Sequence, residues 1–389
     1  MIPYGQQDIN QDDINSVIDV LKSDFLTQGP QVPLFEKEMA SYCGANFAVA
    51  VNSATSALHI ACLALGVRKG DLVWTTPITF VATANCALYC GADVDFVDID
   101  PLTYNLSVDC LEEKLVQAER KGRLPKVIIP VHFSGQPCDM VGIYALSEQY
   151  GFRIIEDASH AIGARYKNEA IGSCRYSDIT VFSFHPVKII TTGEGGMAVT
   201  NESVLAKKMS LLRSHGITRN TTEMSQVSHG PWYYQQIDLG FNYRLTDLQA
   251  ALGLSQLQRL DEFVVKRHAI ANRYEYLLTN LPVVTPLKHC DSYSSFHLYV
   301  IRLNLTQIKK THREVFEALR DAGVGVNLHY IPVYCQPYYE SLGFKLGYCP
   351  EGERYYDEAI SLPMYPGLTL LQQEKVVAVL DSTINESSV

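Results

Sequence analysis

Two residues combine reactive side chains with unusual surroundings. Asp157 follows the β-rich run 152–156, so its carboxylate is expected at the carboxyl end of a central strand, where open α/β sheets bind ligands. An aspartate that caps the next helix explains this position equally well. Lys188 lies among apolar residues in SFHPVKIITTGEGG, and a desolvated amine has a lowered pKa that suits Schiff-base formation. On its own, a loop lysine is usually a surface residue.

Four further residues could hold a phosphate and an aromatic ring. The segment NSATSA at 52–57 joins a strand to a buried helix, whose free amides could bind an anion with the hydroxyls of Thr55 and Ser56. An ordinary helix cap is the alternative. Ser183 precedes Lys188 by five residues, so its hydroxyl could reach the same phosphate. Phe80 could lie on an aromatic ring, although a phenylalanine is more often part of the core.

Taken together, these residues supply an amine, a carboxylate, a phosphate cradle and an aromatic lid near the carboxyl ends of parallel strands. That combination fits pyridoxal 5'-phosphate. The carboxylate would keep the pyridine nitrogen protonated, which makes the ring an electron acceptor. The lysine would hold the aldehyde and, once released, carry a proton between substrate and cofactor.

The elements that position these residues follow from hydrophobic patterns. Between residues 46 and 200, short β-rich runs alternate with helical patterns, which predicts βαβ units and a mostly parallel sheet. Helices are expected at Ser56–Leu65 and Met140–Tyr150, because each apolar stretch stops at a glycine. The expected strands are Phe47–Val51, Leu72–Thr75, Val94–Asp98, Val127–Val131, Arg153–Glu156, Ile179–Phe184 and Gly196–Thr200.

The two ends of the chain differ in sequence pattern from the region between residues 46 and 200. Apolar residues at helical spacing predict a helix around Ile14 to Leu21 and a second one through Phe35 to Gly44. Residues 216–236 have little pattern and are expected to form a long exposed loop. We therefore predict a large domain at 1–250 and a smaller α+β domain at 251–389. Its expected elements are a long helix over Leu245–Leu278, strands at His297–Leu303 and Val324–His329, and a helix at Lys309–Ala322.

Composition excludes several classes of function. The net charge of -10 offers no electrostatic footprint for nucleic acid or an anionic membrane. The first residues lack a signal-peptide pattern and no apolar run reaches membrane-spanning length, so the cytoplasm is the expected location. The ten scattered cysteines form no CxxC pair and are expected to be reduced core thiols. No HxxxH or HxH spacing occurs, so a metal site is not expected.

The chain resembles the DegT/StrS-type nucleotide-sugar aminotransferases, which share the fold of aspartate aminotransferase. The resemblance covers nearly the whole chain. Its ordered motifs are FLTQGPQVPLFE at 25–36, NSATSALH at 52–59, TFVATA at 79–84, IEDASHAIGA at 155–164, SFHPVKIITTGEGG at 183–196, LRSHG at 212–216 and GFNYRLTDLQAALG at 240–253. The implied fold class is α/β, the type I fold of pyridoxal-phosphate enzymes, with a mostly parallel, mixed seven-stranded sheet and a small C-terminal α+β domain.

The resemblance also implies roles for individual residues. Lys188 is the Schiff-base lysine and Asp157 pairs with the pyridine nitrogen. By the same resemblance, Phe80 stacks on the ring, His160 lies near the ring hydroxyl, and the phosphate is held by Thr55, Ser56 and Ser183. In a homodimer, Asn242 and Arg244 reach the neighbouring subunit's site. The sugar nucleotide is contacted by His329 and Tyr330.

The segment GVNLHYIPVYCQPYY at 325–339 is most similar to members that aminate C4 of a UDP-linked 4-keto-6-deoxy-N-acetylhexosamine, with glutamate as donor, in pseudaminic acid synthesis. Tyr334 departs from the histidine expected in such members. Three alternatives stay open: an aminotransferase for another UDP- or dTDP-linked keto sugar, a same-fold dehydratase, and a non-catalytic regulator that binds the cofactor. Lys188 argues against the dehydratases, which carry histidine there.

Overall fold

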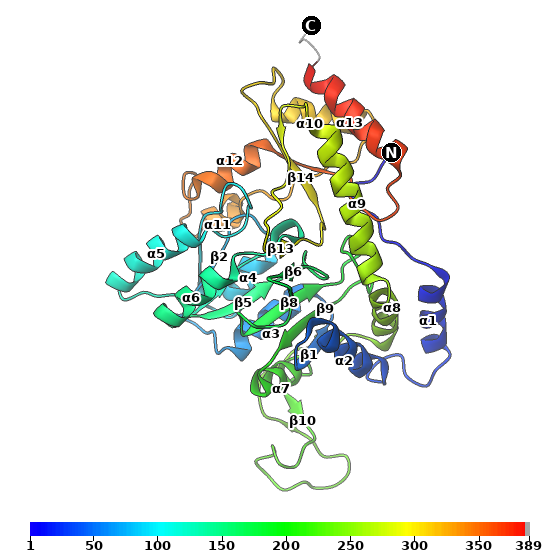
Figure 1. Ribbon diagram of the computed structural model, residues 1–389. Helices are drawn as coiled ribbons and strands as arrows, with labels where there is room; N and C mark the ends of the chain where they lie inside the picture. Colours follow the sequence, from blue (N-terminus) through cyan, green and yellow to red (C-terminus); the bar gives the residue numbers. More distant parts are fainter. Residues whose placement is uncertain (386–389) are drawn as a thin grey trace.

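A mixed seven-stranded sheet forms the centre of the computed structural model, which describes residues 1–385 (Figure 1). The strand order is β1-β9-β8-β5-β4-β2-β3, and only β9 runs antiparallel to its neighbours. The predicted α/β class and mostly parallel sheet are confirmed. The strands are β1 (Phe47–Val51), β2 (Leu72–Thr75), β3 (Asp93–Phe96), β4 (Val127–Ile129), β5 (Arg153–Asp157), β8 (Ile179–Ser183) and β9 (Gly196–Thr200).

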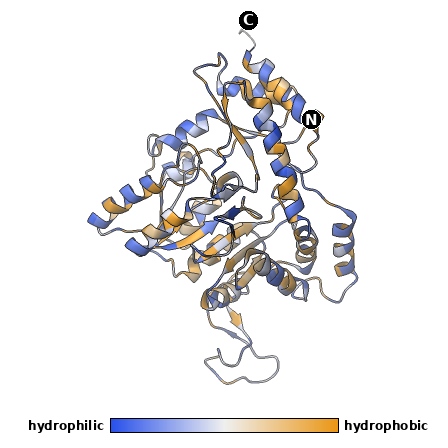
Figure 2. Ribbon diagram, viewed as in Figure 1, coloured by the Kyte–Doolittle hydropathy of each residue, from blue (hydrophilic) through white to orange (hydrophobic). Residues whose placement is uncertain are grey.

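Helices cover both faces of this sheet, which is why its strands are nearly continuous apolar runs. Successive residues of β4 enter different cores: Ile128 packs with Phe35, Leu111 and Ile143, whereas Val127 packs on the opposite face. Figure 2 shows mostly hydrophobic residues in the central strands and a mixture of both kinds in the outer helix α5. The covering helices are α2 (Gln31–Cys43), α5 (Val108–Arg120) and α6 (Met140–Tyr150) on one face, and α3 (Ala54–Ala64), α4 (Ala82–Tyr89) and α7 (Ser203–Leu212) on the other.

A second, antiparallel sheet carries the C-terminal part of the chain. It consists of β12 (Val283–Val284), β14 (Tyr299–Leu303) and β15 (Ala359–Leu362). The strand predicted at Val324–His329 is wrong. That segment forms only single bridges, of Val324 to Ile2 and of Asn327 to Ser361 in β15. The helices packed here are α10 (His312–Asp321) and α13 (Leu370–Asn385).

The long helix predicted over Leu245–Leu278 is two helices, α8 (Asp247–Leu257) and α9 (Leu260–Leu278). Arg259 lies at the break, and its guanidinium binds Asp8 at 2.7 Å and Asp13 at 2.5 Å. These ion pairs fix the amino-terminal segment against the break. The predicted domain boundary at 250 falls inside α8 and stays a prediction, and residues 386–389 of the predicted second domain lie outside the described residues.

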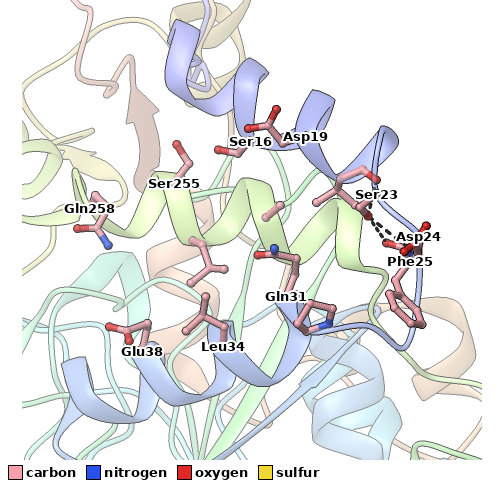
Figure 3. Close-up of a pocket in the computed structure, with 14 residues that line it drawn as sticks. Ser16, Asp19, Ser23, Asp24, Phe25, Gln31, Leu34, Glu38, Ser255 and Gln258 are labelled. Atoms are coloured by element: carbon pink, nitrogen blue, oxygen red, sulfur yellow. Dashed lines mark hydrogen bonds between the residues drawn. The ribbon is translucent and has the colours of Figure 1, made fainter.

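The first helix, α1 (Gln11–Leu21), lies where it was predicted but leaves its apolar side chains in solvent. Ile14, Ile18 and Leu21 are exposed, whereas Asp13 and Val20 are buried. A hollow of about 620 Å³ lies among α1, α2 and α8, with Ser16, Leu34 and Ser255 among its lining residues (Figure 3). The amino-terminal region therefore presents an open, partly apolar surface.

The segment 216–236 is largely the exposed loop that the sequence predicts, and it projects away from the sheet (Figure 1). A two-residue ladder at its base pairs β10 (Ile217–Thr218) with β11 (Gln235–Gln236). The smaller elements elsewhere are β6 (Arg165–Tyr166), β7 (Glu169–Ala170), β13 (Ser292–Tyr293), α11 (Pro337–Glu340), α12 (Pro350–Glu358) and the 3-10 turns Phe133–Gly135 and Val333–Cys335. Within residues 1–385, none of the helices combines the length and apolarity that a membrane crossing requires.

Candidate active site

Asp157 is the last residue of β5, the central strand of the sheet, and is almost fully buried. Its two carboxylate oxygens have different donors. Thr83 Oγ1, on α4, donates to Oδ2 at 2.7 Å, and the backbone N–H of Ser159 donates to Oδ1 at 3.0 Å. Residues 158–164 form turns, so Asp157 caps no helix there. The carboxylate is thus fixed at the carboxyl end of the sheet, as the functional interpretation predicted.

Lys188 follows β8 in the adjoining loop and is partly buried. Its backbone N–H donates to the carbonyl of His185 at 2.8 Å, which fixes the local turn. Desolvation lowers the pKa of the Lys188 amine to about 8, while the nearby negative charge of Asp157 raises it. A substantial fraction of the amine is therefore neutral and nucleophilic near physiological pH.

The amino-terminal end of α3 is the segment for which the sequence predicts an anion cradle. Ser53 caps the helix by accepting a hydrogen bond from Ser56 N at 3.1 Å. The Ser56 hydroxyl donates to Asn52 Oδ1 at 2.6 Å, and Thr55 lies half-buried in the first turn. Helix ends with free N–H groups and hydroxyls of this kind bind phosphate.

Gly196 explains why the motif GEGG precedes β9. A Cβ at this position would lie 2.4 Å from the backbone nitrogen of Ala54 and 2.4 Å from the carbonyl carbon of Ser53. Only glycine therefore allows β9 to approach the start of α3 this closely. Ser183, at the end of β8, pairs with Gly196 across the sheet, so it lies beside the same cradle.

His160 lies in a group of aromatic side chains on the other side of the site. Its Nε2 is 3.2 Å from the Tyr330 hydroxyl, and its ring centroid is 4.5 Å from that of His297. Burial lowers the pKa of His160 well below its usual value, and the positive charge of Lys188 lowers it further. His160 is therefore a neutral imidazole near pH 7.

His329 and Phe80 border this group. Burial and then Lys188 lower the pKa of His329 to about 3, and its Nδ1 is 2.8 Å from the Ser361 hydroxyl. The Phe80 side chain is 59% exposed, so the interpretation of Phe80 as a core residue is wrong. Its ring centroid lies 6.3 Å from that of Tyr330.

The segment that contains Asn242 and Arg244 lies at the carboxyl end of β1. Arg244 forms a bridge with Val51, Asn242 forms one with Ser214, and Asn52 N donates to the carbonyl of Tyr243 at 2.9 Å. Asn242 is exposed and Arg244 is half-buried. The backbone of this segment is thus held beside the anion cradle, while the Asn242 side chain faces solvent.

Sequence reasoning missed several residues of this site. Thr83, which holds Asp157, lies in the motif TFVATA, but its partner is 74 residues away in the chain. Asn52 and Ser53, which bind Ser56, lie in the motif NSATSA but were not predicted as site residues. The local sequence of His297 does not indicate that its ring packs against that of His160.

Two other features lie outside this constellation. Tyr334 is fully buried, accepts a hydrogen bond from Cys349 N at 3.1 Å and donates to Glu353, so it is a core residue. Among residues 1–385, one group of three side chains has ligand atoms within 4.8 Å of one another, namely the exposed residues 289–291. Asp291 N donates there to His289 Nδ1, which occupies one of these atoms.

Comparisons with known proteins agree with this geometry. Residues 7–381 match the family model described as the DegT/DnrJ/EryC1/StrS aminotransferase family. The chain is 40% identical to the spore coat polysaccharide biosynthesis protein SpsC of Bacillus subtilis, over 95% of this chain and 93% of that protein. It is 39% identical to the UDP-4-amino-4,6-dideoxy-N-acetyl-beta-L-altrosamine transaminase of Campylobacter jejuni, over 99% and 98% of the two chains.

A solved structure of an aminotransferase has a similar fold. The aminotransferase PseC of Helicobacter pylori, described as involved in the biosynthesis of pseudoaminic acid, superposes with a TM-score of 0.89 at 31% identity. The match covers 98% of this chain and 99% of that chain. The predicted aspartate aminotransferase-like fold is therefore confirmed over both sheets.

Proposed function

This chain is a member of the DegT/DnrJ/EryC1/StrS aminotransferase family, and we propose that it uses pyridoxal 5'-phosphate to aminate a nucleotide-linked keto sugar. The proposed acceptor is C4 of a UDP-linked 4-keto-6-deoxy-N-acetylhexosamine, in pseudaminic acid biosynthesis, and the proposed donor is glutamate. The observation that carries the proposal is the placement of Asp157 at the end of β5 and of Lys188 in the loop after the neighbouring strand β8, at the same edge of the sheet as the start of α3.

The residues present fit the cofactor. Its phosphate matches the start of α3, where Thr55, Ser56 and the nearby Ser183 offer hydroxyls and where Gly196 keeps Cβ atoms out. Its ring would lie against the exposed side chain of Phe80. When bound, pyridoxal 5'-phosphate supplies an aldehyde for covalent attachment and a ring that accepts electrons.

The side chains of this protein would then have separate roles toward the bound cofactor. Asp157, held by Thr83 and Ser159, would keep the ring nitrogen protonated. Lys188 would bind the aldehyde as a neutral amine and later move the proton between substrate and cofactor carbons. Neutral His160, fixed by Tyr330, would donate or accept at the ring hydroxyl without adding charge.

The proposed sugar rests on two relatives whose names state it or its pathway, the Campylobacter transaminase and the Helicobacter enzyme PseC. The similarity to SpsC, at 40% identity, favours a second candidate, amination of a different keto sugar for a polysaccharide. His329 and Tyr330, which border Phe80 and His160, are the proposed contacts of the sugar nucleotide.

We further propose a homodimer in which Asn242 and Arg244 serve the neighbouring subunit's site. The exposure of Asn242 supports this arrangement. The exposed apolar side chains Ile14, Leu21 and Phe25 provide a surface for contact with a second copy, since exposed apolar patches commonly mark interfaces.

One assay separates the candidate substrates. The purified protein is incubated with glutamate and, in parallel, with UDP-linked and dTDP-linked 4-keto sugars, and the amino sugar is identified by NMR. A new amino group at C4 of the UDP-linked N-acetylhexosamine, absent with a Lys188→Ala variant, is the expected result. Amination of only another keto sugar would favour the second candidate, and release of a deoxygenated sugar without nitrogen would indicate a dehydratase.

A further inference from the structure

The hydroxyl of Tyr330 has a hydrogen-bond partner on one side only. Its oxygen lies 3.2 Å from His160 Nε2, and among residues 1–385 His160 is the one side chain that binds it. The two rings are inclined by 20°, and the Tyr330 centroid lies 6.3 Å from that of Phe80. Tyr330 is also partly exposed. It therefore lies among the residues of the candidate active site, and its hydroxyl can still bind a ligand.

The other nitrogen of His160 decides the direction of this hydrogen bond. The backbone N–H of Ser134 donates to His160 Nδ1 at 3.3 Å. Ser134 is fixed by two hydrogen bonds with Leu298: its Oγ donates to the Leu298 carbonyl at 2.8 Å, and Leu298 N donates to the Ser134 carbonyl at 3.3 Å. A ring nitrogen that accepts an N–H bond carries no proton, so the single proton of the neutral imidazole is on Nε2.

His160 therefore donates to the Tyr330 oxygen. A protonated imidazole would place a second hydrogen at Nδ1, against the N–H of Ser134, and burial lowers the pKa of His160 well below its usual value. Because the Tyr330 oxygen accepts this bond, its own hydrogen points away from His160. Burial and then the charge of Asp157 raise the pKa of the Tyr330 phenol, so the hydrogen is retained near pH 7.

Two neighbouring groups have their protons committed to the protein. The Asn327 amide nitrogen lies 3.3 Å from His329 Nε2, and an amide nitrogen only donates, so the proton of His329 is on Nδ1 and points to the Ser361 hydroxyl at 2.8 Å. The hydroxyl of Thr83 donates to Asp157. Neither group has a proton for a ligand, whereas Tyr330 does.

We propose that Tyr330 is the catalytic acid of the step in which the carbonyl oxygen of a keto substrate leaves as water. This proposal rests on the transaminase function proposed above. The amine nitrogen that the loaded enzyme supplies forms a C–N bond at the carbonyl carbon, and Tyr330 gives its proton to the oxygen as the C–O bonds break. The nitrogen loses two protons, of which one completes the water molecule and the other returns to Tyr330. No electrons are transferred.

His160 acts through Tyr330 in this step and is a positioning residue for it. Its N–H would stabilise the phenolate that exists between the two proton transfers, because a hydrogen bond to an ionised oxygen is stronger than one to a neutral oxygen. Lys188 keeps its separate task of moving the proton between carbons. The proposal therefore predicts that loss of the Tyr330 hydroxyl affects the exchange of oxygen for nitrogen and spares the proton transfer at carbon.

The reaction with glutamate separates these two steps without any sugar. In this direction water adds and 2-oxoglutarate is released, so Tyr330 acts in reverse on the same oxygen. Holoenzyme with Tyr330→Phe is mixed with glutamate. Stopped-flow absorbance follows the loss of the cofactor's imine band, which should stay within about twofold of the parent. Quenched samples give the 2-oxoglutarate of the first turnover, whose release should slow by about 10²-fold.

Tyr166→Phe is the matched control, because Tyr166 is buried and its hydroxyl donates to Asp139 at 2.8 Å, outside the site. This variant should match the parent in both rates, and thermal unfolding checks that both variants fold. Unchanged release of 2-oxoglutarate in Tyr330→Phe would overturn the proposal, and so would an equal slowing of both steps. A parent enzyme that does not react with glutamate would instead contradict the proposed donor.

A second measurement tests the hydrogen-bond direction in the parent holoenzyme and needs no turnover. The protein is labelled with ¹⁵N-histidine, and the signals of His160 are identified by their loss in a His160→Gln variant. The expected spectrum is that of a neutral ring with its proton on Nε2. A proton on Nδ1, or on both nitrogens, would contradict the contact with Ser134 and would overturn the proposal, whatever the behaviour of the Tyr330→Phe variant.

Discussion

Thr83 Oγ1 lies 2.7 Å from Asp157 Oδ2, so a hydroxyl on α4 donates to the carboxylate at the end of β5. Thr83 is itself buried, and its oxygen lies 2.8 Å from the Thr79 hydroxyl. A series of hydrogen-bonded side chains, formed by Thr79, Thr83 and Asp157, therefore joins α4 to β5 beside the site. This chain fixes the orientation of the carboxylate before any ligand binds.

We predict that Thr83→Val lowers kcat by about tenfold, equivalent to about 1.4 kcal/mol, because Asp157 loses the donor that orients it. The free energy of unfolding should fall by about 1 kcal/mol, since one buried hydrogen bond is lost. Thr83→Ser keeps the hydroxyl and should stay close to the parent in both respects. Steady-state kinetics and urea unfolding measure the two effects, and unchanged kcat in Thr83→Val would show that Asp157 needs no orientation by Thr83.

Lys188→Ala should reduce transamination by at least about 10³-fold, because the proton carrier is removed. The variant should still bind pyridoxal 5'-phosphate through the cradle at α3, but without covalent attachment. Borohydride reduction followed by mass spectrometry measures attachment, and equilibrium dialysis measures binding. Covalent retention of the cofactor in this variant would contradict the assignment of Lys188.

Reconstitution with pyridoxal 5'-phosphate should depend on the ionisation of Lys188. Because the pKa of this amine is lowered to about 8, the attachment rate should rise with pH up to about 8 and level off above it. Asp157 raises this pKa, so Asp157→Asn should lower it further and move the profile to lower pH. Stopped-flow absorbance of the apoenzyme measures both profiles. A shift to higher pH in Asp157→Asn would have the wrong sign and would exclude the contact.

Gly196→Ala should weaken cofactor binding and lower the free energy of unfolding by about 1 to 3 kcal/mol, since the added Cβ would meet backbone atoms of Ser53 and Ala54 at 2.4 Å. Gly5→Ala is the matched control, because no heavy atom lies within 4 Å of its added Cβ. Thermal unfolding with and without cofactor compares the two. Equal behaviour of both variants would mean that α3 can move away from β9 at no cost.

Mixed dimers test whether sites are shared. We predict that Lys188→Ala subunits mixed with Asn242→Ala subunits recover activity, because one of the two sites then has a native lysine and a native asparagine. Native mass spectrometry confirms subunit exchange, and each variant alone serves as the baseline. Activity equal to the average of the two baselines would place Asn242 in the site of its own subunit.

The sequence by itself determined the strands of the central sheet and the places of Asp157 and Lys188 beside it. Strands such as Ile179–Ser183 are continuous apolar runs buried on both faces, so their pattern survives in any context. The positions of Asp157 and Lys188 were predictable because Asp157 ends a central strand and Lys188 follows the neighbouring one, and parallel strands bring their carboxyl ends to one edge. The roles of these residues as cofactor ligands remain predictions.

Only the tertiary structure decided which groups hold one another. Thr83 meets Asp157 across 74 residues, and the ring of His160 packs against that of His297 across 137, contacts for which local sequence carries no signal. The break between α8 and α9 lies where Arg259 binds Asp8 and Asp13, and the segment 324–329 forms only single bridges, to Ile2 and to Ser361 of β15. In each case the interaction that decided the local structure came from a residue far away in the sequence.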